Sequence, residues 1–204
     1  MTPALSLDLR AAQHGRLAVL GALSLQVQLG ETVAICGASG VGKSTLLRIL
    51  AGLHADWQGD LSQIAPPAMV FQEPTLLPWR SVRGNITLLT GCSVQVADQA
   101  LADCGLAEKA AAFPNALSLG QQRRLALARA FAMRPQILLM DEAFTSLDPS
   151  LADEMMTLFE TLRAARPLAT VLVTHDPAEA LRLASRTLTL SGHPARFDAS
   201  PLPV

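Results

Sequence analysis

The stretch ICGASGVGKSTLL, residues 35–47, constrains the fold of this chain more than any other segment. It starts in an apolar run, crosses three glycines and enters a segment with a helical apolar stripe, Lys43–Leu53. Glycine weakens the interior of strands and of helices, so a strand, a tight turn and a helix are predicted in that order. The lysine and hydroxyl side chains of the turn have no apolar role, which indicates an anionic ligand there.

The turn fits the pattern G-x-x-x-x-G-K-[ST], in which backbone N–H groups and the helix N-terminus cradle phosphate groups. Lys43 is placed to reach the β- and γ-phosphates of a nucleotide, and the Ser44 hydroxyl to bind Mg²⁺. A glycine-rich turn without a ligand is the alternative, but this one follows a strand and opens a helix, as phosphate binding requires. The predicted nucleotide-binding residues of the turn are Gly37, Ala38, Ser39, Gly40, Val41, Gly42, Lys43, Ser44 and Thr45.

Four continuously apolar runs predict strands that are covered on both faces, as in a parallel sheet. They are Thr32–Cys36, Ala68–Phe71, Gln136–Met140 and Ala169–Thr174. Two earlier segments, LSLDL at residues 5–9 and LSLQVQL at residues 23–29, alternate between apolar and polar residues and predict half-buried strands. Helical segments lie between the apolar runs. The predicted fold class is therefore α/β, with a mostly parallel core sheet and an antiparallel N-terminal β piece.

The whole chain, residues 1–204, is predicted to be one domain that carries an insertion. Strand signals fade after Gln72, where prolines and then alanine-rich helical segments follow. We therefore expect residues 73–135 to form an inserted helical subdomain. Residues 191–204 are small, polar and proline-rich, and are expected to form a loosely held tail.

Composition excludes several classes of protein. The net charge is −1 and only 16% of the residues are charged, so the basic surplus of a nucleic-acid-binding surface is missing. The three cysteines are scattered, and neither a disulfide framework nor a zinc site is predicted. The sequence shows no membrane-spanning apolar run and no secretory pattern at its start, which favours a cytoplasmic protein.

Two acids, Asp141 and Glu142, directly follow the apolar residues ILLM. In a parallel sheet, ligands bind beyond the carboxyl ends of the strands, so both acids are expected to face the phosphate-binding turn. Asp141 would then hold Mg²⁺ together with Ser44, and Glu142 would orient or deprotonate an attacking water. An exposed loop with two acids is the alternative, and the phosphate-binding pattern upstream favours the functional interpretation.

Six ordered motifs make the chain resemble the nucleotide-binding subunit of ATP-binding-cassette (ABC) transporters along nearly its whole length. The phosphate-binding turn is the first motif, and the two acids match the Walker B pair. Leu117–Gln121 (LSLGQ) resembles the family's signature, usually LSGGQ, although it also fits an ordinary helix-capping box. The other matches are Gln72 of the Q-loop, the D-loop residues Ser146, Leu147 and Asp148, and the switch residue His175.

The resemblance implies the P-loop NTPase fold of an ABC cassette and an ATPase mechanism. Two cassettes, most simply two copies of this chain, would pair head-to-tail with ATP between one P-loop and the partner's signature. The signature residues that would face that ATP are Ser118, Leu119, Gly120 and Gln121. Glu142, His175 and Gln72 would act in hydrolysis, and Gln72 would join Ser44 and Asp141 at the Mg²⁺ ion. Hydrolysis would loosen the pair and so move membrane subunits.

Three positions depart from the family pattern. Leu119 replaces the second glycine of the signature, and its Cβ restricts the backbone. Ala143 replaces the usual proline after the glutamate. The family stacks an aromatic residue, often tyrosine, on adenine, and this chain has no tyrosine. His14 stands at the corresponding place and is expected to bind the nucleotide, with a solvent-exposed turn histidine as the alternative.

The segment FQEPTLLPWRSVRGNI, residues 71–86, most resembles that of importers for nitrate, sulfonates and taurine. In the family this region accepts a coupling helix of the membrane permease, so Leu76, Leu77 and Trp79 are the expected contacts. Burial of these side chains in the helical insertion is the alternative. The resemblance also implies an extracytoplasmic solute-binding protein, a place on the inner face of the cell membrane, and a small anion or an organosulfur or nitrogen compound as the solute.

Three other functions remain open from the sequence. Leu119 and the missing aromatic residue suggest a degenerate cassette that hydrolyses ATP poorly, although the lysine, both acids and His175 are retained. A soluble ABC ATPase that acts on nucleic acid or ribosomes would carry coiled coils, fused cassettes or a basic surface, and this sequence has none of them. A P-loop kinase of a small metabolite would have no use for the signature segment.

Overall fold

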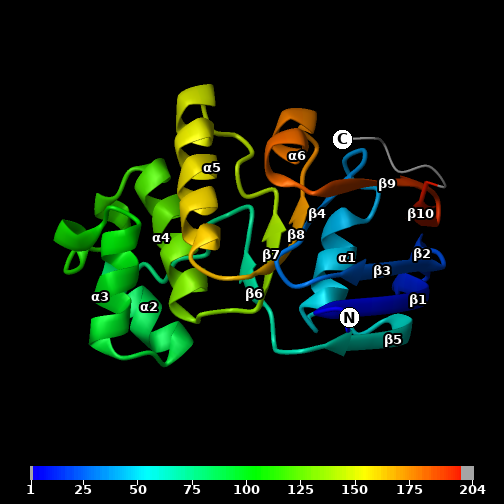
Figure 1. Ribbon diagram of the computed structural model, residues 1–204, viewed down its shortest axis with the longest axis horizontal. Helices are drawn as coiled ribbons and strands as arrows, with labels where there is room; N and C mark the ends of the chain where they lie inside the picture. Colours follow the sequence, from blue (N-terminus) through cyan, green and yellow to red (C-terminus); the bar gives the residue numbers. More distant parts are fainter. Residues whose placement is uncertain (1, 199–204) are drawn as a thin grey trace. The chain divides into compact units, whose positions relative to one another are not determined.

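The computed structural model describes residues 2–198, which divide into two compact units (Figure 1). Of the described residues, unit 1 comprises 2–69, 136–142 and 166–198, and unit 2 comprises Val70–Pro135 and Ala143–Ala165. Each unit has a hydrophobic core of its own. The expected helical insertion, residues 73–135, lies in unit 2, which also takes up a second segment of the chain.

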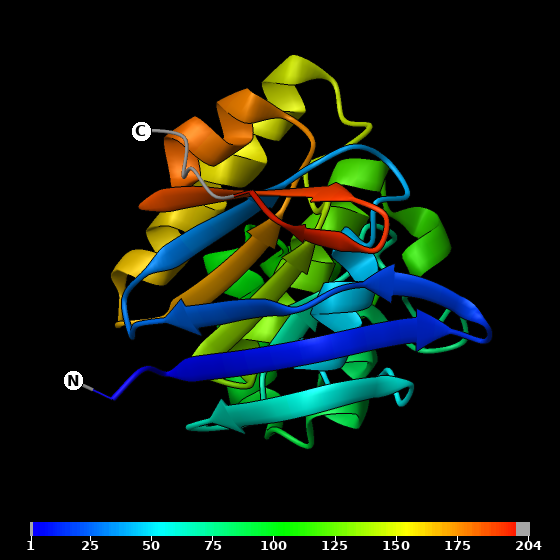
Figure 2. The ribbon, with the colours of Figure 1, turned by 90° about the vertical axis from the view of Figure 1, so that its right-hand side faces the viewer.

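The described strands form one curled sheet in the order β3-β1-β2-β10-β9-β4-β8-β7-β6, with β5 paired to β1 (Figure 2). The strands are β1 (Leu5–His14), β2 (Leu17–Leu20), β3 (Leu23–Val27), β4 (Thr32–Cys36), β5 (Trp57–Gln63), β6 (Ala68–Val70), β7 (Ile137–Asp141), β8 (Ala169–Val173), β9 (Arg186–Gly192) and β10 (Ala195–Phe197). β1 pairs antiparallel with β2, β3 and β5, whereas β9, β4, β8 and β7 pair in parallel. The predicted α/β class, with a parallel core and an antiparallel N-terminal piece, is confirmed.

The apolar runs of the sequence form the middle of the sheet. Every residue of β7 and β8 is buried, and four of the five residues of β4 are buried. Four strands were not predicted: β2, β5, β9 and β10. β5 shows why, because none of its residues is fully buried and it contains a glycine, which interrupts the strand signal. A Cβ at Gly59 would lie 2.2 Å from the carbonyl oxygen of Asp8, so glycine there permits the close approach of β5 to β1.

Helix α1 (Lys43–Leu50) anchors the phosphate-binding turn to the core of unit 1. It contacts β7 and β8, and four of its apolar side chains are fully buried. Those side chains share one core with Leu5, Leu7 and Leu9 of β1. Helix α6 (Pro177–Leu183) packs on β4. The turn before α1 therefore starts at the buried strand β4 and ends at a helix that is packed in the core, so both of its ends are fixed.

The expectation of a loosely held tail is wrong for residues 191–198. Ser191 and Gly192 belong to β9, and β10 pairs antiparallel with β9 and in parallel with β2. Ala195 is fully buried in the core of unit 1, and its carbonyl oxygen accepts the N–H of Gly21 at 2.8 Å. A three-residue strand among small, polar and proline-rich residues is held by these tertiary contacts and leaves no local sequence signal. Residues 199–204 of the expected tail lie outside the described residues.

Unit 2 is helical. Its helices are α2 (Val82–Thr90), α3 (Val94–Asp103), α4 (Leu119–Ala132) and α5 (Pro149–Ala164), with short 3-10 helices at Ala107–Lys109 and Pro114–Ala116. α4 contacts α2, α3 and α5, and Leu125, Ala128 and Ala132 lie on its buried face, as their spacing predicted. The N-caps of the four helices are Ser81, Ser93, Ser118 and Asp148, each accepting a backbone N–H. Among residues 2–198, no helix combines the length and the apolarity needed to cross a membrane.

One buried hydroxyl of the core gives a test of the packing. Thr170 of β8 is fully buried, and its Oγ1 has no hydrogen-bond partner among the described residues. Burying a hydroxyl without a partner costs about 1–3 kcal/mol. We therefore expect Thr170→Val to raise the free energy of unfolding by about 1 kcal/mol in urea denaturation. A decrease would show that the hydroxyl is satisfied, for example by a buried water.

Candidate nucleotide-binding and hydrolysis site

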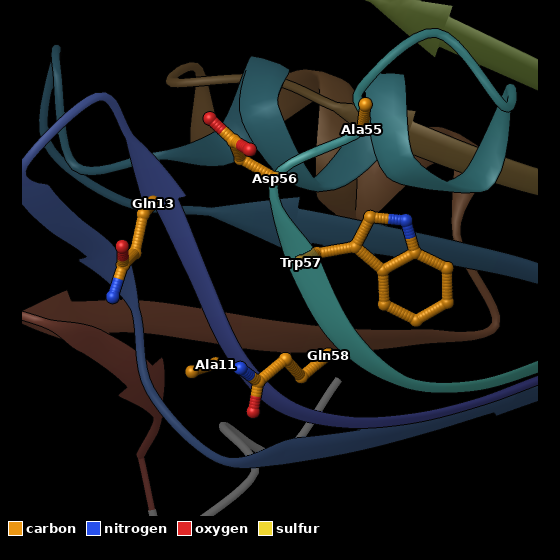
Figure 3. A pocket seen from close by; sticks show the side chains of 6 residues that line it. All are labelled: Ala11, Gln13, Ala55, Asp56, Trp57 and Gln58. Atoms are coloured by element: carbon orange, nitrogen blue, oxygen red, sulfur yellow. The ribbon is translucent and has the colours of Figure 1, made fainter.

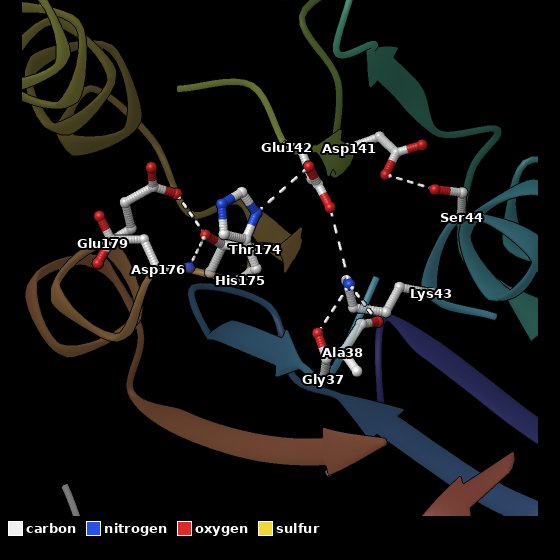
Figure 4. Close-up of polar contacts among 10 residues, drawn as sticks. All are labelled: Gly37, Ala38, Lys43, Ser44, Asp141, Glu142, Thr174, His175, Asp176 and Glu179. Atoms are coloured by element: carbon white, nitrogen blue, oxygen red, sulfur yellow. Dashed lines mark hydrogen bonds and ion pairs between the residues drawn. The ribbon is translucent and has the colours of Figure 1, made fainter. Parts of the chain in front are cut away.

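The turn after β4 holds the side chain of Lys43 (Figure 4). Lys43 is the first residue of α1 and is 4% exposed. Its ammonium group donates to the carbonyl oxygens of Gly37 and Ala38 at 2.8 and 3.0 Å. It also lies 3.7 Å from Oε1 of Glu142. The two loop carbonyls and the carboxylate of Glu142 thus compensate the buried positive charge of Lys43.

Two glycines of the turn are required by their neighbours. Gly37 has φ 155°, and a Cβ there would lie 2.5 Å from the carbonyl oxygen of Leu190 in β9. Gly42, the N-cap of α1, has φ 114°, and a Cβ there would lie 2.8 Å from Cδ2 of Leu20 in β2. L-residues with a side chain rarely adopt either conformation. The pattern of glycines therefore serves the packing of the turn on the sheet as well as phosphate binding.

Asp141 and Ser44 place two oxygen ligands next to the turn. The Ser44 hydroxyl donates to Oδ1 of Asp141 at 3.0 Å. Burial raises the pKa of the Asp141 carboxyl, and the hydrogen bond from Ser44 partly opposes this effect. Among residues 2–198, no group of three or more His, Cys, Asp or Glu side chains is arranged to hold a metal ion. One hydroxyl and one carboxylate suit Mg²⁺, which keeps several waters and phosphate oxygens as ligands.

Glu142 lies between Lys43 and His175 and contacts both side chains. Its Oε2 lies 3.4 Å from Nδ1 of His175, and its Oε1 faces Lys43 (Figure 4). Its φ is 48°, in the left-handed region that residues with a Cβ seldom adopt. Its backbone N–H donates to the carbonyl oxygen of Val173 at 3.0 Å, which holds it in place. Backbone strain that is held in this way is typical of functional sites.

An open recess of about 440 Å³ lies between these groups. Its lining residues are Gly37, Ala38, Ser39, Glu142 and His175. They come from the turn after β4, the end of β7 and the turn after β8, three neighbouring strands of the sheet. The structure therefore brings the acids to the phosphate-binding turn, as the carboxyl-end argument predicted, and places His175 beside Glu142. The volume lies in the range of small-molecule sites, about 300–1,000 Å³.

A second hollow, of about 190 Å³, lies beside the pairing of β5 with β1 (Figure 3). Its lining residues are Ala11, Gln13, Ala55, Asp56, Trp57 and Gln58. Trp57 is half-buried against the core of unit 1, and the N–H of Gln13 donates to the carbonyl oxygen of Asp56 at 2.9 Å. The hollow is smaller than ordinary ligand sites, and none of its lining residues belongs to the phosphate-binding turn or to the carboxyl ends of β7 and β8, so we assign it no part in the chemistry.

The signature segment forms the start of α4 in unit 2. Ser118 and Gln121 form a reciprocal capping box: the N–H of Ser118 donates to Oε1 of Gln121 at 3.0 Å, and the N–H of Gln121 donates to the Ser118 hydroxyl at 3.3 Å. Leu119 is the first residue of the helix, is 49% exposed, and is not among the described residues with positive φ. A Cβ at Gly120 would lie 2.8 Å from Cδ1 of Leu151. A side chain at 120 would therefore displace the side chain of Leu151, whereas Leu119 is accommodated without positive φ.

The remaining predicted site residues lie at element ends. Gln72 is exposed near the start of unit 2, and His14 is exposed at the end of β1 in unit 1. Asp148 caps α5 by accepting the N–H of Leu151 at 3.1 Å, and Ser146 just before it has φ 62°. The contribution of these residues to nucleotide binding stays a prediction, because no contact with the turn is described for them.

The segment that was expected to contact a permease is held by Asn85, which the sequence analysis did not single out. Asn85 is fully buried in α2. Its Oδ1 accepts the N–H of Leu77 at 2.7 Å, and its Nδ2 donates to the carbonyl oxygens of Leu77, Arg80 and Ser81 at 3.0–3.1 Å. An asparagine in a helix carries no local signal for this role, since its partners are backbone atoms of the preceding loop.

Arg129 of α4 holds the first part of the same segment. Its guanidinium donates to the carbonyl oxygens of Pro74 and Thr75 and to the hydroxyl of Thr75, at 3.0–3.1 Å. Burial lowers the pKa of this guanidinium. In this segment, Leu76 is half-buried against the core of unit 2, whereas Trp79 is 69% exposed. Of the expected permease contacts, Trp79 is therefore the one that presents most of its side chain.

In P-loop NTPases, a glycine-rich turn surrounds a lysine, and acids at the end of a neighbouring strand face that turn. The fold and the site assign the chain to this class. Within it, the family model described as ABC transporter matches residues 20–145. The chain belongs to this family, and its predicted identity as an ATP-binding subunit with ATPase activity is confirmed.

The similar curated proteins include several aliphatic sulfonates import ATP-binding proteins, SsuB. The protein of Mycobacterium avium (strain 104) is 46% identical over 184 residues, which cover 87% of this chain and 73% of that protein. The protein of Granulibacter bethesdensis is 44% identical over 191 residues, 93% of this chain and 80% of that protein. The SsuB 2 protein of Rhizobium johnstonii is 47% identical over 176 residues, 84% of this chain and 71% of that protein.

The hydrogen bonds of Asn85 predict a large cost for its removal. Asn85→Ala would leave the N–H of Leu77 and a group of loop carbonyls without their partner, at a cost of about 2–3 kcal/mol in the free energy of unfolding. Asn115→Ala is the matched control, because Asn115 is exposed in the same unit. We expect it to change stability by less than about 0.5 kcal/mol. Equal denaturation midpoints for the two variants would contradict the role of Asn85.

Proposed function

We propose that this chain powers the import of a small anionic solute, an aliphatic sulfonate, through ATP-driven pairing of two cassettes that are bound to a membrane permease. The observation that carries this proposal is the juxtaposition of Lys43, Glu142 and His175 around one recess. The names of the similar proteins support the solute class and the direction of transport.

Binding of ATP would replace contacts that the site makes within itself. The phosphates would take the ammonium group of Lys43 from the carbonyls of Gly37 and Ala38, and the N-terminus of α1 would add its positive end. Ser44, Asp141 and Gln72 would hold Mg²⁺, which supplies positive charge at the phosphate oxygens. Neutralisation of Lys43 by phosphate would then release Glu142 from its ion pair.

Hydrolysis would depend on the pair formed by Glu142 and His175. The freed carboxylate of Glu142 would accept a hydrogen bond from water and orient it for in-line attack on the γ-phosphate. His175, held within 3.4 Å of that carboxylate, would contact the γ-phosphate from the turn after β8. The side chain of Glu142 lines the recess, and its left-handed backbone is held by the hydrogen bond to the carbonyl oxygen of Val173.

A second copy of the chain would complete the site. Ser118, Leu119, Gly120 and Gln121 of that copy would face the γ-phosphate, with the free N–H groups at the start of α4 as donors. The D-loop residues Ser146, Leu147 and Asp148 would meet the partner cassette, and His14 would stack on adenine. ATP would then act as an interface element that hydrolysis removes.

The assembled system would include a permease and an extracytoplasmic solute-binding protein, with this chain on the cytoplasmic face of the membrane. The permease contact would involve Leu76, Leu77 and Trp79. Asn85 and Arg129 fix the backbone of this segment by hydrogen bonds. Binding of Trp79 to the permease would therefore cost little conformational entropy of the loop.

Removal of the acid predicts a trapped dimer. Glu142→Gln should keep ATP bound but unhydrolysed, because the amide leaves Lys43 and Ser44 in place and takes away the base. We expect a monomer without nucleotide and a dimer with Mg-ATP in light scattering, with ATP hydrolysis reduced about a hundredfold or more.

Lys43→Ala serves as the control, since it should stay monomeric for lack of nucleotide. A variant at position 142 that hydrolyses ATP at the normal rate would refute the assignment of the base. Persistent monomers that bind ATP would instead point to a dimer interface that needs the permease.

The exposed tryptophan gives a separate test of the permease contact. Trp79→Ala should reduce co-purification with the cognate permease about tenfold or more while nucleotide affinity stays unchanged, because buried aromatic anchors carry much of the energy of interfaces. Leu181→Ala in α6 is the matched control, since Leu181 is also 69% exposed. Undiminished co-purification of the Trp79 variant would count against this contact.

A further inference from the structure

A single hydroxyl ties together the turn that carries His175. Thr174 directly follows β8 and is fully buried. Its Oγ1 donates to Oε2 of Glu179 at 2.6 Å and accepts the N–H of Asp176 at 3.0 Å (Figure 4). Its own N–H donates to the carbonyl oxygen of Ile35 at 3.2 Å. The residues on both sides of His175 are therefore fixed by one side chain that is anchored to the sheet.

The acceptor of this hydrogen bond is itself fixed. Glu179 lies on α6, which packs on β4, and the residue is only 5% exposed. Asp176 is the N-cap of that helix, and its side chain accepts the N–H of Ala178 at 2.8 Å. Burial raises the pKa of Glu179, and the hydrogen bond from Thr174 opposes that effect. A buried carboxyl group is retained only where partners satisfy it, so the bond joins two elements at a defined point.

The second buried threonine of this segment, Thr170 in β8, shows that burial alone does not produce such a contact. Thr170 has the same burial as Thr174, yet its hydroxyl has no partner among the described residues. The two threonines differ in their place along the chain, since only Thr174 leads directly into the turn of His175. The hydroxyl at 174 therefore serves the turn rather than the strand.

The ring of His175 depends on that turn. Its side chain is 54% exposed, so packing restrains it little, and its Nδ1 lies 3.4 Å from Oε2 of Glu142. We propose that Thr174 and Glu179 are positioning residues for ATP hydrolysis, because their hydrogen bond fixes the backbone that holds His175 against Glu142. The inference rests on the hydrolytic roles of Glu142 and His175 in the proposed function.

Removal of the hydroxyl tests the inference in the full chain bound to its permease. Thr174→Val should lower kcat for ATP hydrolysis about tenfold to a hundredfold, since small displacements of a catalytic group have effects of this size. KM for ATP should change less than about twofold, because the turn around Lys43 is untouched. Thr174→Ser keeps the hydroxyl and should restore kcat. Unchanged binding of a fluorescent ATP analogue shows that each variant is folded.

Two further comparisons separate positioning from general damage. Thr170→Val makes the same chemical change four residues earlier and should leave kcat unchanged. Glu179→Ala should lower kcat as Thr174→Val does, and the double variant should be no slower than either single variant, because both remove one bond. Glu179→Gln keeps an acceptor oxygen for Thr174 and should retain most of the activity.

The outcomes distinguish the inference from the proposal on which it rests. A normal kcat in Thr174→Val, an equal loss in Thr170→Val, or an effect on KM alone overturns the positioning role. Hydrolysis that survives both Glu142→Gln and His175→Ala overturns the proposed function instead. Loss of kcat with rescue by serine, and with non-additive effects at 174 and 179, supports the inference.

Discussion

In-register parallel hydrogen bonding between β4, β8 and β7 determines where the polar groups of the site lie. Ile35 of β4 and Asp141 of β7 both pair with Val173 of β8, so the three strands end at one level. The chain leaves these strands with Gly37, Glu142 and, one residue further on, His175. Because these strands are buried on both faces, a slip of register would disrupt the packing of their side chains, and the core therefore fixes the site.

Charge balance determines the arrangement of these groups. Lys43 is nearly fully buried, and an unpaired buried ammonium group would be costly. Two loop carbonyls and Glu142 compensate it, and Glu142 in turn faces His175. A ligand that replaces these partners must itself be anionic and rich in acceptors, as phosphates are. The geometry thus selects the chemistry of the ligand.

The parts of the structure that the sequence predicted are those with a local signal. β4, β7 and β8 were predicted to within about one residue because continuous apolar runs mark them. β10 and the contacts of Asn85 were missed, because tertiary pairing and backbone partners create them. Thr174 was taken as the last residue of an apolar run, and the hydrogen bonds of its hydroxyl with Glu179 and Asp176 become visible only in the fold. Site residues with a motif are therefore predictable, and those that support them are not.

The signature segment shows how a departure from a family pattern can be judged on physical grounds. Within unit 2, a Cβ at Gly120 would press on the side chain of Leu151, which would have to move. Leu119 occupies a first helical position that any residue can adopt, with its side chain half-exposed and the capping box intact around it. No strain therefore marks the substitution as a defect of folding. A preference for glycine at position 119 has to arise from a contact outside unit 2. In the proposed dimer, that contact is the nucleotide bound by the second cassette.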